Sequence, residues 1–296
     1  MSLFGHLARL VQDPPPEFVF ELSEAGIAYC HGGDPAFEPL EPGVLNPSPV
    51  DDNLPRPERA SALLQAIAPR LPGAKAKVRR AAVILPDHAA RVSVLDFDAF
   101  PSNAAEQLAL VRFRVKKTVP FDIDSAAVSY FAQPVAAKNG GGSKRHEVVA
   151  VTVALEVLAR YEALFRNAGF HPGEITTSSL AALNLYPEPQ HRAEAPGVFA
   201  KLAGRVLTVM VIASGRLRLF RCLALEAASE MEIRGVLQPT LAYAEDELGA
   251  KVERLTVCGF AHAPLDDIPT EPLRSRRGVA GANNAGLLGY LEDRVN

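Results

Sequence analysis

Side chains that can bind metal ions or act as nucleophiles are spread thinly along this 296-residue chain. Its seven histidines share no short spacing with one another or with cysteine, so the sequence indicates no metal site. It also contains no nucleophile-elbow pattern of the kind that hydrolases use. Two close pairs of acids, Asp96 with Asp98 and Asp122 with Asp124, are typical of turns and helix starts. These side chains predict no recognisable catalytic centre.

A glycine-rich segment, Lys138–Lys144, has the composition of a phosphate-binding loop. Such a loop runs from a strand into the N-terminus of a helix, where backbone N–H groups face the phosphates. The residues that follow this segment, Val148–Val153, are instead continuously β-prone. We therefore predict a hairpin, with strands at Ala126–Val135 and His146–Ala154 and a flexible tip between them.

The composition is that of an ordinary globular protein. Hydrophobic residues make up 48% and charged residues 22% of the chain, so it can bury a core. The 31 basic and 34 acidic side chains give a net charge of −3, without the basic excess of a nucleic-acid-binding protein. No apolar run approaches the roughly 20 residues of a membrane span, and Met1–Val11 lacks the features of a signal peptide. Together with three widely separated cysteines, this predicts a soluble cytoplasmic protein without nucleic-acid partners.

Two basic clusters and one apolar segment leave alternatives open. The clusters, Arg70–Arg80 and Arg112–Lys117, fit solvated faces, but they also suit an acidic partner or lipid headgroups. Leu3–Val11 has the spacing of a short amphipathic helix, which would pack on the body of the protein or touch a membrane surface.

Apolar periodicity and chain-breaking residues predict alternating hairpins and helices. Seven prolines make Gly32–Pro57 a long loop, and an arginine- and glycine-rich composition predicts another at Thr270–Asn283. The expected helices are Glu58–Ala68, Ser102–Val119 with Ser102 as its cap, Leu155–Ala168, and Ser229–Leu248 with an interruption at Pro239. The expected strands outside the hairpin above are Glu17–Leu22, Ala25–His31, Val78–Leu85, Arg91–Phe97, Val198–Leu202, Val206–Ala213, Arg216–Leu225 and Val252–Cys258.

The order of these elements resembles that of the bilobed actin-like ATPase fold, an α/β fold of the ribonuclease H-like type. The chain is most similar to the PilM family of type IV pilus assembly proteins, in the group that also contains FtsA and GspL. The resemblance implies a first lobe over 1–190, with a small α/β subdomain inserted near 87–170, and a second lobe over 191–296. The segments that carry it are Ala81–Pro86, Arg114–Asp124, Tyr161–Phe165 with Ala168–Phe170, and Gly215–Arg221.

In this fold, two strand-turn-strand loops hold the nucleotide, one in each lobe, each with an acid for the Mg²⁺ shell and a glycine against the phosphates. In the first loop here a glutamate replaces the aspartate and a serine stands at the glycine, while the second loop has a lysine and an alanine. The third family element, a Gly-Gly turn under the adenosine, is reduced to a single glycine. A lysine cannot hold the Mg²⁺ shell, and Glu21 with Glu24 would repel phosphates that lack their metal. The degenerate positions are Glu21, Ser23, Lys201, Ala203, Gly204, Cys258 and Gly259.

The resemblance therefore implies a pseudo-ATPase without activity, a scaffold with no cofactor, in which ATP and Mg²⁺ are expected only if these loops are aligned wrongly. Its implied partner is the cytoplasmic tail of a PilN-like membrane protein, which would hold it peripherally at the inner membrane. One alternative is a GspL-like type II secretion component, which fits less well because this chain stops at Asn296 without a membrane span or a periplasmic domain. A divergent ATPase or kinase, a cleft that binds another anion through Lys201, and a homo-oligomer also remain open.

Overall fold

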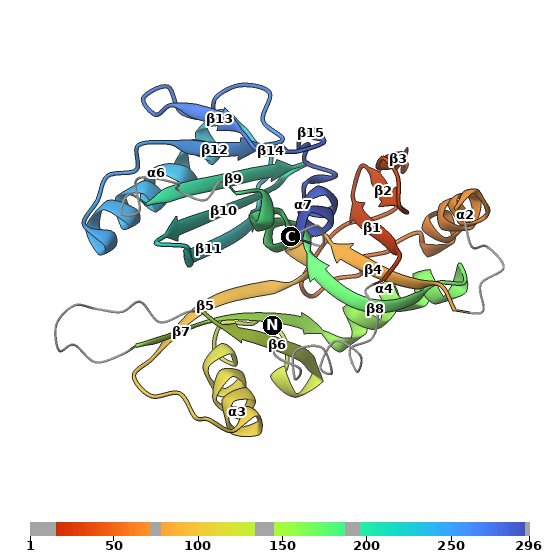
Figure 1. Ribbon diagram of the computed structural model, residues 1–296, viewed down its shortest axis with the longest axis horizontal. Helices are drawn as coiled ribbons and strands as arrows, with labels where there is room; N and C mark the ends of the chain where they lie inside the picture. Colours follow the sequence, from red (N-terminus) through yellow and green to blue (C-terminus); the bar gives the residue numbers. More distant parts are fainter. Residues whose placement is uncertain (1–15, 72–77, 134–144, 187–195, 294–296) are drawn as a thin grey trace, which may run out of the picture.

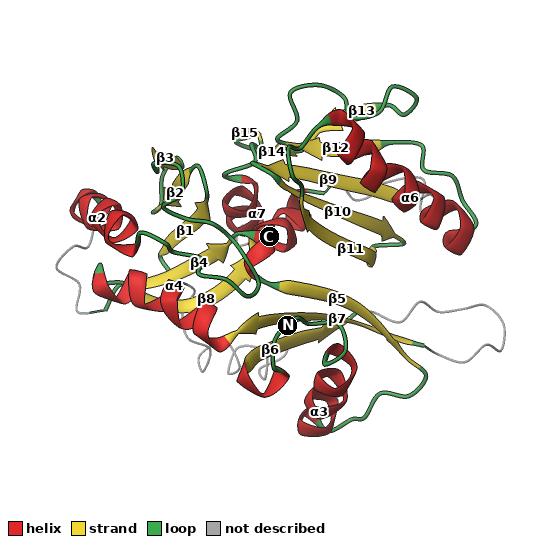
Figure 2. Ribbon diagram, turned by 180° about the vertical axis from the view of Figure 1, so that it is seen from behind, coloured by secondary structure: helices red, strands yellow, loops and turns green. Residues whose placement is uncertain are grey.

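The computed structural model describes residues 16–71, 78–133, 145–186 and 196–293. In this part of the chain, two five-stranded sheets and one three-stranded sheet are covered by helices (Figures 1 and 2). The predicted amphipathic segment at residues 3–11 and the glycine-rich tip at 138–144 lie outside the described residues.

The first sheet has the strand order β3-β2-β1-β4-β8. Strands β1, β2 and β3 are antiparallel neighbours, whereas β4 is parallel to β1 and β8 is parallel to β4. The predicted hairpin at residues 17–31 is therefore confirmed. The expected loop at 32–57 contains β3, an edge strand, where a proline nitrogen need not donate a hydrogen bond to a neighbour. The strands are β1 (Phe18–Ser23), β2 (Gly26–Cys30), β3 (Ala36–Pro39), β4 (Arg80–Leu85) and β8 (His171–Thr177).

The second sheet, in the order β11-β10-β9-β12-β13, repeats the first in both order and strand direction. The predicted meander is confirmed, and it lies in a different sheet from the hairpin at 17–31, as a bilobed fold requires. The expected loop at 270–283 instead holds β13 and a short hairpin of β14 and β15. The strands are β9 (Gly197–Ala203), β10 (Val206–Ala213), β11 (Arg216–Ala224), β12 (Leu255–Cys258), β13 (Thr270–Pro272), β14 (Arg274–Ser275) and β15 (Gly278–Val279).

Between β4 and β8 the chain forms a third sheet, in the order β5-β7-β6, with helix α3 packed on it. The predicted hairpin is confirmed for its described residues. The predicted helix cap was wrong by one residue: Asn103, not Ser102, caps α3, because its side-chain oxygen accepts a hydrogen bond from Ala105 N at 2.8 Å. The elements are β5 (Arg91–Phe97), α3 (Ala104–Val115), β6 (Ala126–Ala132) and β7 (His146–Ala154).

Helices α2 (Pro57–Ile67) and α4 (Leu155–Asn167) cover one face of the first sheet, and α6 (Glu230–Leu248) covers one face of the second. The expected interruption of α6 at Pro239 does not occur. Residues on both sides of the proline, Leu237 and Ala244, are buried against the second sheet, and this packing holds the two halves of the helix in line.

Helix α7 (Ala285–Asp293), which the sequence analysis missed, covers the other face of the first sheet together with the short helix α5 (Ser178–Ala182). A glycine makes this packing close, because a Cβ atom at Gly289 would lie only 2.1 Å from the carbonyl oxygen of Ala181. The last described helix therefore crosses from the second sheet back to the first, and Figure 1 shows it between the two. The exact lobe limits given above stay a prediction.

Candidate functional site

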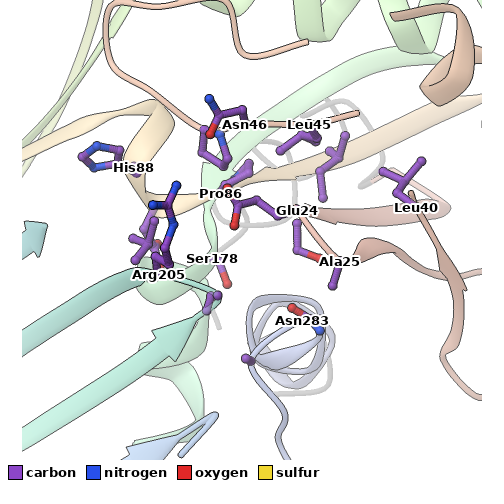
Figure 3. Close-up of a pocket in the computed structure, with 18 of the residues that line it drawn as sticks. Glu24, Ala25, Leu40, Leu45, Asn46, Pro86, His88, Ser178, Arg205 and Asn283 are labelled. Atoms are coloured by element: carbon purple, nitrogen blue, oxygen red, sulfur yellow. The ribbon is translucent and has the colours of Figure 1, made fainter. Parts of the chain in front are cut away.

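A cleft of about 680 Å³ opens where the β1–β2 turn of the first sheet approaches the β9–β10 turn of the second (Figure 3). Its volume is within the range of pockets that hold small molecules. Glu24 and Arg205 project into it from the two turns. Leu40, Leu45 and Pro86 give the cleft an apolar wall, and Asn46, His88, Ser178 and Asn283 add polar groups.

The β1–β2 turn uses its serine for its own closure. The Ser23 hydroxyl donates to the carbonyl oxygen of Gly26 at 3.0 Å and accepts from the Gly26 N–H at 3.2 Å. Ser23 is buried, so its hydroxyl serves the turn rather than the cleft. Burial raises the pKa of the neighbouring Glu24, and the positive charge of Arg205 opposes that rise.

The β9–β10 turn retains a glycine for two physical reasons. Gly204 has a φ of +59°, a left-handed conformation that other residues adopt at a cost, and Ala203 pairs with Val206 at the base of the turn. A Cβ atom at Gly204 would also lie 2.6 Å from a carboxylate oxygen of Glu24. The two turns are therefore in close contact across the mouth of the cleft.

The third predicted position lies at the end of β12, where it packs against its neighbours. Gly259 has a φ of +81°, and a Cβ atom there would lie 2.1 Å from the carbonyl oxygen of Leu202. The buried Cys258 thiol donates to the carbonyl of Ala280 at 3.4 Å, and burial raises its pKa to about 12. The thiol is therefore neutral and its role here is packing.

Strand alternation explains why two charged side chains meet beneath the cleft. The even-numbered residues of β1 join the core under α2 and α4, so Glu21 points to the opposite face. The even-numbered residues of β9 join the core under α6, so Lys201 also points away from its own helix. Glu21 is 1% exposed and Lys201 is 2% exposed, so both charges are withdrawn from water.

Lys201 is bound by residues of the first sheet and its following loops. Its ammonium lies 3.2 Å from a carboxylate oxygen of Asp87 and also donates to the hydroxyl of Ser178. That hydroxyl donates in turn to Glu21, whose second oxygen accepts from the Leu287 N–H at 2.7 Å. The alternative that the cleft binds another anion through Lys201 is disfavoured, because its ammonium is buried and paired with a carboxylate.

The sequence analysis missed Asp87, which is the acceptor at the centre of this network. Besides Lys201, the Asp87 carboxylate accepts from Ser179 N at 2.7 Å, from the Ser179 hydroxyl at 2.6 Å and from the Thr208 hydroxyl at 3.2 Å. Asp87 follows β4, and Ser178 and Ser179 follow the parallel neighbour β8. A polar residue within two positions of the end of each of two adjacent parallel strands, whose ends meet at one edge of the sheet, is the sequence signal that could have found them.

The charges of this network do not cancel if all groups are ionised. One ammonium and two carboxylates, those of Glu21 and Asp87, give 1 − 2 = −1. Burial raises the pKa of Glu21, so this carboxyl retains its proton to a higher pH than usual. Burial alone would lower the pKa of Lys201, but attraction by Asp87 and Glu21 outweighs it and raises that pKa. The network therefore holds the Lys201–Asp87 ion pair beside a carboxyl, that of Glu21, whose pKa burial raises.

These residues do not fit Mg²⁺. A hard divalent ion needs several oxygen ligands that converge without a competing cation, and here the ammonium of Lys201 already binds Asp87 and Ser178. In the described ranges there is also no group of three or more histidine, cysteine, aspartate or glutamate side chains arranged to hold a metal ion. No metal-dependent step can be derived for this site.

Two solved structures are similar to this chain over nearly its whole length. The PilM-PilN type IV pilus biogenesis complex has a TM-score of 0.65 and 16% identity, with 96% of this chain and 100% of that chain covered. The cytoplasmic domain of EpsL, an inner membrane component of the type II secretion system of Vibrio cholerae, has a TM-score of 0.54 and 14% identity, with 94% of each chain covered. No protein-family model matches the sequence, and no curated protein does so either.

The chain therefore has the bilobed α/β fold of the actin-like group, in the arrangement seen in PilM and the EpsL cytoplasmic domain. Identities of 16% and 14% are too low to carry more than the fold. In the part of the chain that the structure describes, no helix combines the length and apolar character needed to cross a membrane.

Proposed function

We propose that this protein is a non-catalytic cytoplasmic scaffold of a type IV pilus assembly platform, which binds the cytoplasmic tail of a PilN-like membrane protein. The observation that carries the proposal is the similarity to the PilM-PilN complex, which spans 96% of this chain and the whole of that one. The shared fold supplies the same framework for a partner, although the identity of 16% leaves the contact residues unspecified.

The non-catalytic part of the proposal is supported by the buried network. A nucleotide-hydrolysing site needs a metal ion held near the phosphates, and Lys201 brings a fixed positive charge to this place instead. We therefore expect neither ATP hydrolysis nor a bound cofactor.

The proposed partner would approach as an extended peptide. Backbone hydrogen bonds then supply affinity, and pockets for individual side chains supply selectivity. The protein would lie peripherally at the inner membrane through this partner, with no role for nucleic acid.

The decisive experiment is calorimetric titration with a synthetic peptide of the cytoplasmic tail of a PilN-like membrane protein. We expect saturable binding that Mg-ATP does not change, with a scrambled peptide as the control. A tenfold change of affinity on adding Mg-ATP, about 1.4 kcal/mol of coupling, would contradict nucleotide independence. Absence of binding in both conditions would remove the scaffold proposal.

A type II secretion component is the second candidate, because the EpsL cytoplasmic domain covers 94% of this chain. The two candidates differ in the partner that they need. Pull-down with the tails of the pilus and the secretion membrane proteins, in parallel and at equal concentration, separates them. Retention of only the secretion tail would favour the second candidate.

A further inference from the structure

The two lobes meet in a buried charged network, and the Asp87 carboxylate joins them. Ser179, from the same lobe, gives it two hydrogen bonds. Lys201 on β9 and Thr208 on β10, from the other lobe, give it one each, both at 3.2 Å. All four residues are 4% exposed or less, so these bonds form without competition from water.

We propose that Lys201 is a built-in latch, whose ammonium holds the two lobes in one closed arrangement in the absence of any bound ligand. The latch consists of Lys201, Asp87, Ser178 and Glu21. This inference goes beyond the proposed function and does not depend on it, because it concerns the cleft and not the partner.

The Lys201 ammonium is the counter-charge of carboxyl groups that are buried away from water. With Lys201 in place, the two carboxyl groups share one internal cation, through Asp87 directly and through the Ser178 hydroxyl for Glu21. Without it, the buried Asp87 carboxylate would lose its counter-charge and would lie in a region of low dielectric beside Glu21, which repels it strongly when ionised. Separation of the lobes would admit water and relieve that repulsion.

A second contact between the lobes lies at the edge strand β11, which runs beside β5 (Figures 1 and 2). The side-chain amide of Gln133 donates to the carbonyl of Leu217 at 2.8 Å and accepts from its N–H at 2.7 Å, as a neighbouring strand would. Glu147 on β7 pairs with Arg216 at 3.0 Å and with Arg218. This contact is less buried than the latch, and Glu147→Gln provides a control that weakens an inter-lobe ion pair elsewhere.

Distance measurement between spin labels on the two lobes tests the latch. Cys30, Cys222 and Cys258 are buried, so labels can be attached to cysteines introduced at the exposed positions Arg59 on α2 and Glu247 on α6. We expect one narrow distance distribution for the otherwise unaltered protein, with or without Mg-ATP. Lys201→Met, which keeps the side-chain length and removes the charge, should give a broader and longer distribution, and Glu147→Gln should change it less.

Acidification shows whether the longer distances in Lys201→Met result from loss of the latch charge or from a general loss of packing. Lowering the pH from about 8 to about 5 should protonate Glu21 in Lys201→Met, remove its repulsion with Asp87 and return the distances toward the narrow distribution. The other titratable groups near the ammonium are the Cys222 and Cys258 thiols, whose pKa burial raises to about 12, and they stay neutral throughout. His88, which lies next in sequence to Asp87, has a pKa that burial and the positive charge of Arg91 lower. It is present in both proteins, and the unaltered protein measured over the same pH range is the control for its titration.

A second variant keeps the test decisive if Lys201→Met does not fold. Lys201→Met combined with Glu21→Gln and Asp87→Asn removes every charge of the latch at nearly constant volume. It should show the narrow distances of the unaltered protein, because no buried acid is left to repel another, and these distances should not respond to pH. Unaltered narrow distances in folded Lys201→Met at about pH 8 would overturn the proposal, as would broad distances in the variant without charges. A narrower distance distribution of the unaltered protein on adding Mg-ATP would overturn it too.

Discussion

At the scale of single residues, the buried network is asymmetric in its two acids. Asp87 contacts the ammonium directly and accepts four hydrogen bonds in all, whereas Glu21 reaches Lys201 only through Ser178. Removing the direct partner of a buried charge destabilises the folded state, because the remaining charge has no counter-ion. Keeping an additional buried acid ionised also costs folding free energy. The two acids should therefore respond to neutral substitution in opposite ways.

Asp87→Asn should destabilise the protein by about 3–5 kcal/mol, because it leaves the Lys201 ammonium buried without its direct counter-ion. Urea unfolding at neutral pH measures the loss. Asp246→Asn, on the exposed side of α6, is the matched control and should change the stability by less than about 0.5 kcal/mol. Equal effects of the two variants would show that Asp87 carries no special charge pairing.

Glu21→Gln should gain stability relative to the unaltered protein as the pH rises. The pKa of Glu21 in the folded state lies above its ordinary value of 4.5, so the folded state retains a proton that the unfolded state has released. The stability of the unaltered protein therefore falls as the pH rises from 4.5 through the folded-state pKa, and the variant lacks this loss. Thermal unfolding of both proteins from about pH 4.5 to about pH 8 tests this. A constant difference in Tm over that range would contradict it.

At the scale of elements, turn glycines and strand periodicity made much of the fold predictable. The hairpin at 17–31, the meander at 198–225 and the hairpin closed by β7 were all evident from local sequence. Helix α7 was not, because Gly286 and Gly289 lower its intrinsic helix propensity, and their purpose is visible only against Ser178 and Ala181. Close packing between segments distant in sequence decided that element.

The residues of the candidate site also fall into those that local sequence identifies and those that depend on tertiary contacts. Glu21 and Lys201 could be located from the sequence because they stand at fixed places in strand-turn-strand units. Asp87 and Ser178 could not, because their contacts depend on how the two sheets meet. Whether the lysine faced the cleft or the protein interior was likewise decided by tertiary contacts.

Replacement of three glycines by alanine distinguishes the cost of backbone strain from that of a steric clash, because all three have a positive φ but differ in the space around an added Cβ atom. Gly215→Ala should cost about 1–2 kcal/mol, since its φ is +68° and an added Cβ would meet nothing within 4 Å. Gly204→Ala should cost slightly more, because Glu24, which its Cβ would meet, is a flexible side chain that can move. Gly259→Ala should cost most, because a backbone oxygen lies at 2.1 Å from the added Cβ. Urea unfolding gives the order, and a different order would contradict this account.

At the scale of the whole molecule, the two sheets repeat one strand order around a cleft, while the residues beneath the cleft differ between the lobes. The topological equivalent of Glu21 is Lys201, an acid in one lobe and a base in the other. Equivalent positions of opposite charge attract where two acids would repel and would need a cation between them. The cleft thus keeps its shape, while the charge of Glu21 is balanced by the lysine of the other lobe and not by a bound cation.

Mg-ATP should not stabilise this protein against heat. A ligand that binds the folded state at 100 times its Kd, for example about 5 mM Mg-ATP with a Kd of about 50 µM, would stabilise it by about 2.7 kcal/mol. That would raise the Tm by several degrees for a chain of this size. We expect no shift beyond the error of the measurement, with Mg²⁺ alone and Mg-ADP as controls. A reproducible upward shift that needs both Mg²⁺ and ATP would contradict the expectation.

The hydrogen bond from Leu287 N–H to Glu21 joins residues that are 266 positions apart in the sequence. During synthesis on a ribosome, β1 and its hairpin emerge before the second sheet, but the helix that covers their second face emerges only after that sheet. Until α7 has been made, Val19 and Glu21 lack the helix that buries them, so one face of the first sheet remains exposed in the nascent chain. One face of the first sheet is thus completed only after all the strands of the second sheet have been made.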